Sequence, residues 1–190
     1  MRPLPSTLQN RIKALLHQKN QVLLAIDGPC GGGKSTLAEA IVQVFPNALI
    51  IRADDFFLQP HQRTPQHLSE PGGNLDRERL IEEVLKPLAA RSYQGHQRYN
   101  CKANLLEAVP GAQRPLIILE GSYSHHPDLS PFYDLKVFLD IGSDLQLSRL
   151  EKRCEPEALA RFTDSWIPLE NTYFNHFNIR NQADVRLIAI

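Results

Sequence analysis

Eight residues near the start of the chain have the types and spacing of a phosphate-binding loop. Residues 28–35 read Gly-Pro-Cys-Gly-Gly-Gly-Lys-Ser, which fits the pattern G-x-x-x-x-G-K-S. Glycine at four of the eight positions lets backbone N–H groups turn inward and form a concave anion site. In this pattern the lysine reaches the β- and γ-phosphates and the serine hydroxyl holds Mg²⁺. The sequence therefore predicts ATP and Mg²⁺ as ligands, and the residues predicted to contact them are Gly28, Pro29, Cys30, Gly31, Gly32, Gly33, Lys34, Ser35 and Thr36.

Acidic residues follow two later apolar runs. Asp54 and Asp55 come after one run, and Glu120 comes after another. In open α/β sheets, ligands bind at the carboxyl ends of the strands, so these carboxylates are expected beside the phosphate loop. Phosphoryl transfer to a hydroxyl needs a residue that orients it and takes its proton. We expect Asp54 to be this base, with Asp55 as the alternative, and Glu120 to hold Mg²⁺ together with Ser35.

Two arginines late in the chain can supply positive charge for the transition state. Arg149 and Arg153 are four residues apart and so share one face of a predicted helix. On a lid formed by residues of about 149–165, they would clamp phosphate oxygens, with Arg153 at the nucleotide and Arg149 also at the acceptor. The alternative is that they form surface ion pairs with the nearby acidic residues Asp144, Glu151, Glu155 and Glu157.

Nearly continuous apolar runs alternate with helical patterns along the chain. The predicted strands are Val22–Ile26, Ala48–Ile51, Arg114–Leu119, Leu135–Ile141 and Val185–Ile190. Helices are predicted near the N-terminus and at Thr36–Val44, Asp76–Arg91, Asp144–Arg153 and Glu157–Phe177. This order predicts an α/β fold of the P-loop NTPase type. It would be a doubly wound, five-stranded parallel sheet flanked by helices, in one domain of residues 1–190.

The connection between the second and third predicted strands is far longer than a simple crossover needs. Residues of about 56–113 contain a Pro/Gln/His-rich loop, a Gly72-Gly73 turn, a helix and a polar, aromatic stretch. Long structured insertions of this kind usually serve function. We therefore expect this segment to bind the acceptor, the alternative being a surface insertion without a role.

The composition limits the class of partner. The chain of 190 residues has 21 basic and 21 acidic residues, so no net field attracts nucleic acid or an anionic membrane. No apolar stretch is long enough to span a bilayer, and no secretory signal is recognisable. The three cysteines form no C-x-x-C pair, which favours a reducing, cytoplasmic setting. The oligomeric state stays open, with a homodimer among the options.

The order of these motifs resembles the uridine kinase and phosphoribulokinase-like superfamily of P-loop kinases. The resemblance runs from about residue 22 to 190. It rests on the phosphate loop, the Asp54-Asp55-Phe56-Phe57 segment, the Gly73-Asn74-Leu75-Asp76 segment, Glu120-Gly121, Arg149 with Arg153, and Ala183-Asp184-Val185. This superfamily includes kinases of nucleosides and of pantothenate. The resemblance implies an ATP-dependent kinase whose acceptor is a small molecule with a hydroxyl group, a nucleoside being favoured.

The resemblance also implies roles for single residues. Asp54 resembles the catalytic base, and Asp76 resembles the residue that binds ribose hydroxyls in nucleoside kinases. Tyr99 falls where those enzymes place an aromatic residue beside the nucleobase of the acceptor. Arg149 and Arg153 match the lid arginines. The residues expected at the acceptor are thus Asp55, Phe56, Asp76, Tyr99 and Arg149. Without the resemblance, Asp76 could simply begin a helix and Tyr99 could be a half-buried strand residue.

The acceptor itself stays open at this stage. After Tyr99 the chain reads Asn100-Cys101-Lys102, and the Ser-His-Ser-Arg pattern of uridine–cytidine kinases is missing. Pantothenate, a sugar or a glycerate-like acid are therefore alternative acceptors, and a non-catalytic NTP-binding switch or accessory ATPase is an alternative function. A nucleoside monophosphate kinase would need arginines for the acceptor phosphate, and the insertion offers Arg63, Arg77, Arg79, Arg91 and Arg98.

Overall fold

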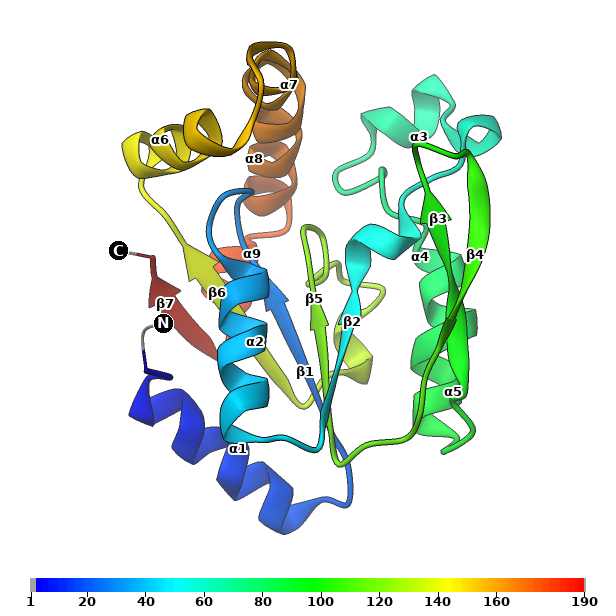
Figure 1. The fold of residues 1–190 in the computed structure, drawn as a ribbon, viewed down its shortest axis with the longest axis vertical. Coiled ribbons are helices and arrows are strands. Elements are labelled where there is room, and N and C mark those ends of the chain that lie inside the picture. The colour runs from blue at the N-terminus through cyan, green and yellow to red at the C-terminus, as the bar shows by residue number, and fades with distance from the viewer. Residues whose placement is uncertain (1–2, 190) are drawn as a thin grey trace.

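The computed structural model describes residues 3–189, and its centre is a five-stranded parallel sheet. The strand order is β2-β5-β1-β6-β7 (Figure 1). The strands are β1 (Val22–Asp27), β2 (Ala48–Arg52), β5 (Leu116–Glu120), β6 (Leu135–Asp140) and β7 (Val185–Ile188). The predicted P-loop NTPase type of sheet is confirmed. The last predicted strand extended to Ile190, which lies outside the described residues.

Both faces of the sheet are covered, because every residue of β1 and β5 is buried. One face packs against α1 (Ser6–Gln18) and α2 (Lys34–Val44), through residues such as Leu8, Ile12 and Ile41. The opposite face packs against α8 (Ile167–His176) and the helical run of the insertion. Its largest buried side chains are Phe56, Phe138, Tyr173 and Phe174. Figure 1 shows that α2 begins directly after the loop that follows β1 and runs back down along the sheet.

A helical arm follows β6 and rises above the carboxyl edge of the sheet (Figure 1). It consists of α6 (Ser143–Arg153), α7 (Pro156–Arg161), a π-helical turn (Phe162–Trp166) and α8. The expected break near Pro156 is present, since α6 ends at Arg153 and α7 begins at Pro156. The short α9 (Ile179–Gln182) then leads into β7.

The long insertion between β2 and β5 forms a second arm (Figure 1). It begins with 3₁₀ turns at Ala53–Phe56 and Pro60–Gln62, followed by α3 (Pro65–Ser69). A continuous helical run comprises α4 (Arg77–Leu80), a π-helical turn (Ile81–Leu85) and α5 (Lys86–Ala89). The antiparallel hairpin of β3 (Gly95–Asn100) and β4 (Leu105–Pro110) completes it, and the sequence had not predicted this hairpin. Within residues 3–189, no helix has the length and apolar character needed to cross a membrane.

Candidate active site

The glycine-rich loop wraps around the amino end of α2. Gly33 is the N-cap residue of this helix and has a φ of 96°, a left-handed conformation that favours glycine. The ammonium group of Lys34 is held inside the loop, where Nζ donates to Gly28 O at 2.6 Å and to Pro29 O at 3.2 Å. N–H groups and a positive helix dipole at this point form an anion site that suits a polyphosphate.

The base of the loop is fixed by a buried carboxylate at the end of β1. Asp27 is fully buried and accepts hydrogen bonds from three donors. These are Gly28 N at 2.7 Å, His125 N at 2.9 Å and the hydroxyl of Tyr173 at 2.8 Å. Because the donors come from the loop, the segment after β5 and helix α8, Asp27 joins three elements behind the site.

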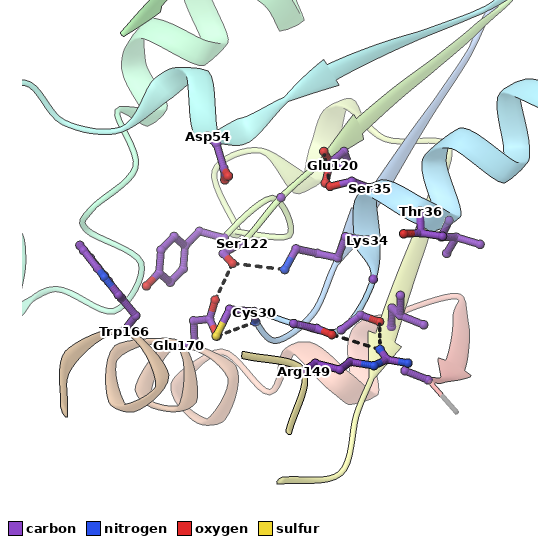
Figure 2. A pocket seen from close by; sticks show the side chains of 18 of the residues that line it. Cys30, Lys34, Ser35, Thr36, Asp54, Glu120, Ser122, Arg149, Trp166 and Glu170 are labelled. Carbon is purple, nitrogen blue, oxygen red and sulfur yellow. Dashed lines mark hydrogen bonds between the residues drawn. The ribbon is translucent and has the colours of Figure 1, made fainter. Parts of the chain in front are cut away.

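A hydroxyl and a carboxylate meet where the motif predicts the metal. Ser35 Oγ donates to Glu120 Oε1 at 3.1 Å, and Glu120 is only 5% exposed (Figure 2). Burial raises the pKa of Glu120, while the hydrogen bond from Ser35 and the charge of Lys34 act in the opposite direction. Mg²⁺ in nucleotide sites takes one or two protein oxygen ligands, water and phosphate oxygens, so this pair fits Mg²⁺. Residues 3–189 contain no cluster of three or more His, Cys, Asp or Glu side chains suited to a metal.

Asp54 projects from the turn after β2 into the space above Lys34 and Ser35 (Figure 2). This side chain is exposed to the cleft, and partial desolvation by the residues around it raises the pKa of its carboxyl group. The charge of Asp55 raises it further, whereas the charges of Lys34, Arg52 and Arg153 lower it. The carboxylate is therefore placed to receive a proton from a hydroxyl in the cleft.

Four other side chains expected at the acceptor do not line this cleft. Asp55 turns toward the hairpin, where Oδ2 lies 3.0 Å from His96 Nε2, and Phe56 is fully buried in the core. Asp76 is the N-cap of α4, accepts from Arg79 N at 3.0 Å and also accepts from Gln62 Nε2. Tyr99 is 4% exposed and donates its hydroxyl to Asn104. Packing and capping thus engage these side chains within the protein, and Phe57 faces the cleft in place of Phe56.

Both predicted lid arginines line the cleft, together with Arg161. Arg149 lies against the outside of the phosphate loop, with Nη1 3.1 Å from Gly31 O and 3.3 Å from Gly32 O (Figure 2). The guanidinium of Arg153 lies 5.6 Å from the centre of the Phe162 ring. The structure therefore brings the phosphate loop, Asp54, the Ser35–Glu120 pair and these arginines together around one cleft of about 1270 Å³.

Several known proteins that resemble this chain are kinases. It is 27% identical to uridine kinase from Streptococcus uberis over 146 residues, which span 72% of this chain and 69% of that enzyme. Its fold matches a possible uridine kinase from Bacillus stearothermophilus with a TM-score of 0.66 and 18% identity, over 95% of this chain and 99% of the other. D-glycerate 3-kinase from Cryptococcus neoformans has a similar fold, with a TM-score of 0.60 and 13% identity over 96% of this chain and 94% of that one. The sequence matches no protein-family model.

In sequence and in fold, the chain is similar to the uridine kinase and phosphoribulokinase-like P-loop kinases. It is an ATP-dependent kinase of a small molecule. Two residues of this kinase that the sequence did not point to are Glu170 and Ser122. Glu170 Oε2 accepts from Cys30 N at 2.9 Å, and Oε1 accepts from Ser122 Oγ at 2.5 Å (Figure 2). Ser122 Oγ also lies 3.4 Å from Lys34 Nζ, so the two residues join α8 to the phosphate loop.

The rest of the kinase's cleft combines aromatic and polar side chains. Its aromatic lining consists of Phe57, Tyr123, Phe162 and Trp166. Asn74 and Arg63 lie on the insertion side. Five arginines of the insertion were considered as ligands of an acceptor phosphate. Within residues 3–189, Arg63 is the only one of these five that lines the cleft. Arg77, Arg79 and Arg98 form ion pairs with acidic side chains instead.

Proposed function

We propose that this kinase transfers the γ-phosphoryl group of Mg·ATP to a hydroxyl group of a nucleoside. The observation that carries the proposal is the position of Asp54, whose carboxylate enters the same cleft as Lys34 and the Ser35–Glu120 pair. The sequence relatives named uridine kinase support a nucleoside as acceptor. Free cysteines at positions 30, 101 and 154 support action in the reducing cytoplasm.

In the proposed reaction, the N–H groups of residues 33–35 at the start of α2 and the ammonium group of Lys34 bind the phosphates. Ser35 and Glu120 would hold Mg²⁺, which would supply positive charge to the bound phosphates. Asp54 orients the acceptor hydroxyl and accepts its proton while the oxygen bonds to the γ-phosphorus and the bond to the β-phosphate oxygen breaks. Arg149 and Arg153 stabilise the charge that moves onto the leaving group.

The test is a screen for phosphate acceptors. The purified protein is incubated with Mg·ATP and separate pools of nucleosides, sugars, hydroxy acids and pantothenate, and each pool is searched by mass spectrometry for a product carrying one added phosphate. We expect a nucleoside 5′-monophosphate. An added phosphate found only in another pool would replace the nucleoside as acceptor. ATP hydrolysis that no pool changes would argue against transfer to a small molecule.

A further inference from the structure

Asn74 is a buried polar residue whose side chain faces the cleft. The residue is 6% exposed and lines the cleft next to the turn that carries Asp54. Its backbone oxygen accepts a hydrogen bond from Leu58 N at 3.1 Å. Its side-chain amide has no hydrogen-bond partner among residues 3–189, and it is not one of the fully enclosed polar groups without a partner, so it is accessible from the cleft that the residue lines. An amide offers one carbonyl acceptor and two N–H donors, so this side chain has unused capacity directed at a ligand.

Arg63 and Asn74 are both hydrogen-bonded to the backbone of Leu58. Its Nε donates to Leu58 O at 2.9 Å, while Leu58 N donates to Asn74 O. Among the described residues, no carboxylate lies within 4 Å of its guanidinium nitrogens, in contrast to Arg77 and Arg79 of the same insertion. The hydrogen bond from Nε fixes the orientation of the planar group, so its remaining N–H donors are available on the cleft side.

Both residues have a fixed position relative to Asp54. Residues 56–58 continue directly from the 3₁₀ turn that contains Asp54. They pair with residues 74–76 through the Phe57–Leu75 bridge and the hydrogen bond from Asp76 N to Phe56 O at 2.7 Å. An acceptor bound to Asn74 and Arg63 would therefore be held at a fixed position relative to Asp54, the proposed catalytic base. Phe57 also lines the cleft at this point and offers an apolar surface for a planar group.

We propose that Asn74 and Arg63 are the residues that recognise the acceptor, and that they bind the polar edge of a pyrimidine ring. This inference rests on the proposed function, because it names the part of the nucleoside that is read. The N3–H and neighbouring carbonyl of uracil match the acceptor and donor of one amide, and rotation of the amide matches N3 and the amino group of cytosine. Arg63 donates to the remaining ring carbonyl. The sequence had placed Asp76 at the ribose hydroxyls and Tyr99 beside the nucleobase, and it had assigned no residue to the polar edge of that base.

The test compares Asn74→Ala with the wild-type protein on uridine and on N3-methyluridine. Removing the amide should lower kcat/KM for uridine about 10- to 100-fold through the acceptor KM, because one buried hydrogen-bond pair is lost. The KM for ATP should stay within about twofold, since Asn74 does not touch the phosphate loop. The wild-type protein should discriminate strongly against N3-methyluridine, and Asn74→Ala should lose most of that discrimination. Arg63→Gln should raise the acceptor KM in the same way.

Two surface substitutions serve as matched controls: Asn181→Ala, on α9, and Arg91→Gln, in the insertion but outside this cleft. Both should leave the KM for uridine unchanged. Thermal unfolding and binding of a fluorescent ATP analogue establish that each variant is folded. Turnover of uridine with wild-type KM in Asn74→Ala and Arg63→Gln would overturn the recognition role and leave the proposed function intact. An equal N3-methyl penalty in wild type and Asn74→Ala would also overturn it. Turnover of hydroxy acids but of no nucleoside would overturn the pyrimidine assignment and the proposed function together.

Discussion

The carboxylates of the neighbouring residues Asp54 and Asp55 point in different directions, one into the cleft and the other toward the hairpin. Asp54 lines the cleft above Lys34, whereas Asp55 Oδ2 lies 3.0 Å from His96 Nε2. His96 Nδ1 is in turn 2.8 Å from the hydroxyl of Tyr93, and the Asp55 carbonyl accepts from Arg79 at 2.9 Å. Asp55 thus ties the catalytic turn to the hairpin and to α4, and this arrangement favours Asp54 over Asp55 as the base.

Substituting the two aspartates separately tests this assignment. Asp54→Asn should lower kcat by about 10²- to 10⁴-fold with little change in ATP binding, because it removes the proton acceptor but keeps the shape. Asp55→Asn should retain most of kcat and lower the melting temperature, since it weakens the contact with His96. Steady-state kinetics and thermal unfolding separate the two effects. An inactive Asp55→Asn beside an active Asp54→Asn would reverse the roles.

The pH dependence of kcat/KM should also report on Asp54, because this ratio reflects the ionisation of the free enzyme. The base must be ionised to accept a proton, so the rate should rise with pH through the pKa of this group. Burial raises that pKa above the ordinary value of 3.8, and the acid limb should therefore lie at a higher pH than for a solvated aspartate. The limb should be missing from the residual activity of Asp54→Asn. An unchanged limb in that variant would assign it to another group.

The same pKa shift predicts that Asp54 lowers the stability of the fold at neutral pH. A carboxyl group whose pKa is raised by folding disfavours its ionised form in the folded protein. This cost is present at a pH above the folded pKa and disappears below the unfolded value near 3.8. Asp54→Asn should therefore raise the melting temperature at pH 7 but not at pH 3. The control is Asp144→Asn, at an exposed position on α6. This substitution should not raise the melting temperature at pH 7 or at pH 3.

The Ser35–Glu120 pair predicts a defined response to Mg²⁺. Glu120→Gln should raise the Mg²⁺ concentration needed for half-maximal activity by about tenfold or more, because the neutral amide is a weaker ligand than a carboxylate. Titration of activity with Mg²⁺ at saturating ATP measures this change. Glu39→Gln, an exposed position on α2, should leave the titration unchanged. The same Mg²⁺ dependence in Glu120→Gln and wild type would remove Glu120 from the metal site.

Glu170 should control both the phosphate loop and the reactivity of Cys30. Glu170→Ala leaves two donors without their partner, at a cost of about 1–3 kcal/mol for each buried group, and should lower the melting temperature and weaken ATP binding. The thiol of Cys30 has its pKa raised to about 12, first by burial and then by the charge of Glu170. Glu170→Gln should lower that pKa and speed alkylation of Cys30 by iodoacetamide. Alkylation of the exposed Cys101 should not change, and equal rates at Cys30 in both proteins would contradict the coupling.

The sequence predicted those elements of this kinase whose structure is determined by neighbouring residues. The loop of residues 28–35, the strand before it, the helix after it and the break at Pro156 all follow from residue type and spacing. The hairpin was missed because β3, from Gly95 to Asn100, is mostly polar and gives little apolar alternation. Glu170 was missed because 140 residues separate it from Cys30, and no spacing rule joins an acid on one helix to a distant loop. The roles of Asp55 and Phe56 depend on which way a turn faces, which only the packed structure determines.

The contact between Glu170 and the phosphate loop bears on the thermodynamics of nucleotide binding. A glycine-rich segment would ordinarily lose much conformational freedom when a ligand orders it. Here the carboxylate on α8 and the lysine ammonium hold the segment in its curved shape through hydrogen bonds within the protein. Much of that entropy is lost during folding, so ATP should bind with a small entropic penalty and little change in backbone hydrogen exchange at residues 28–33.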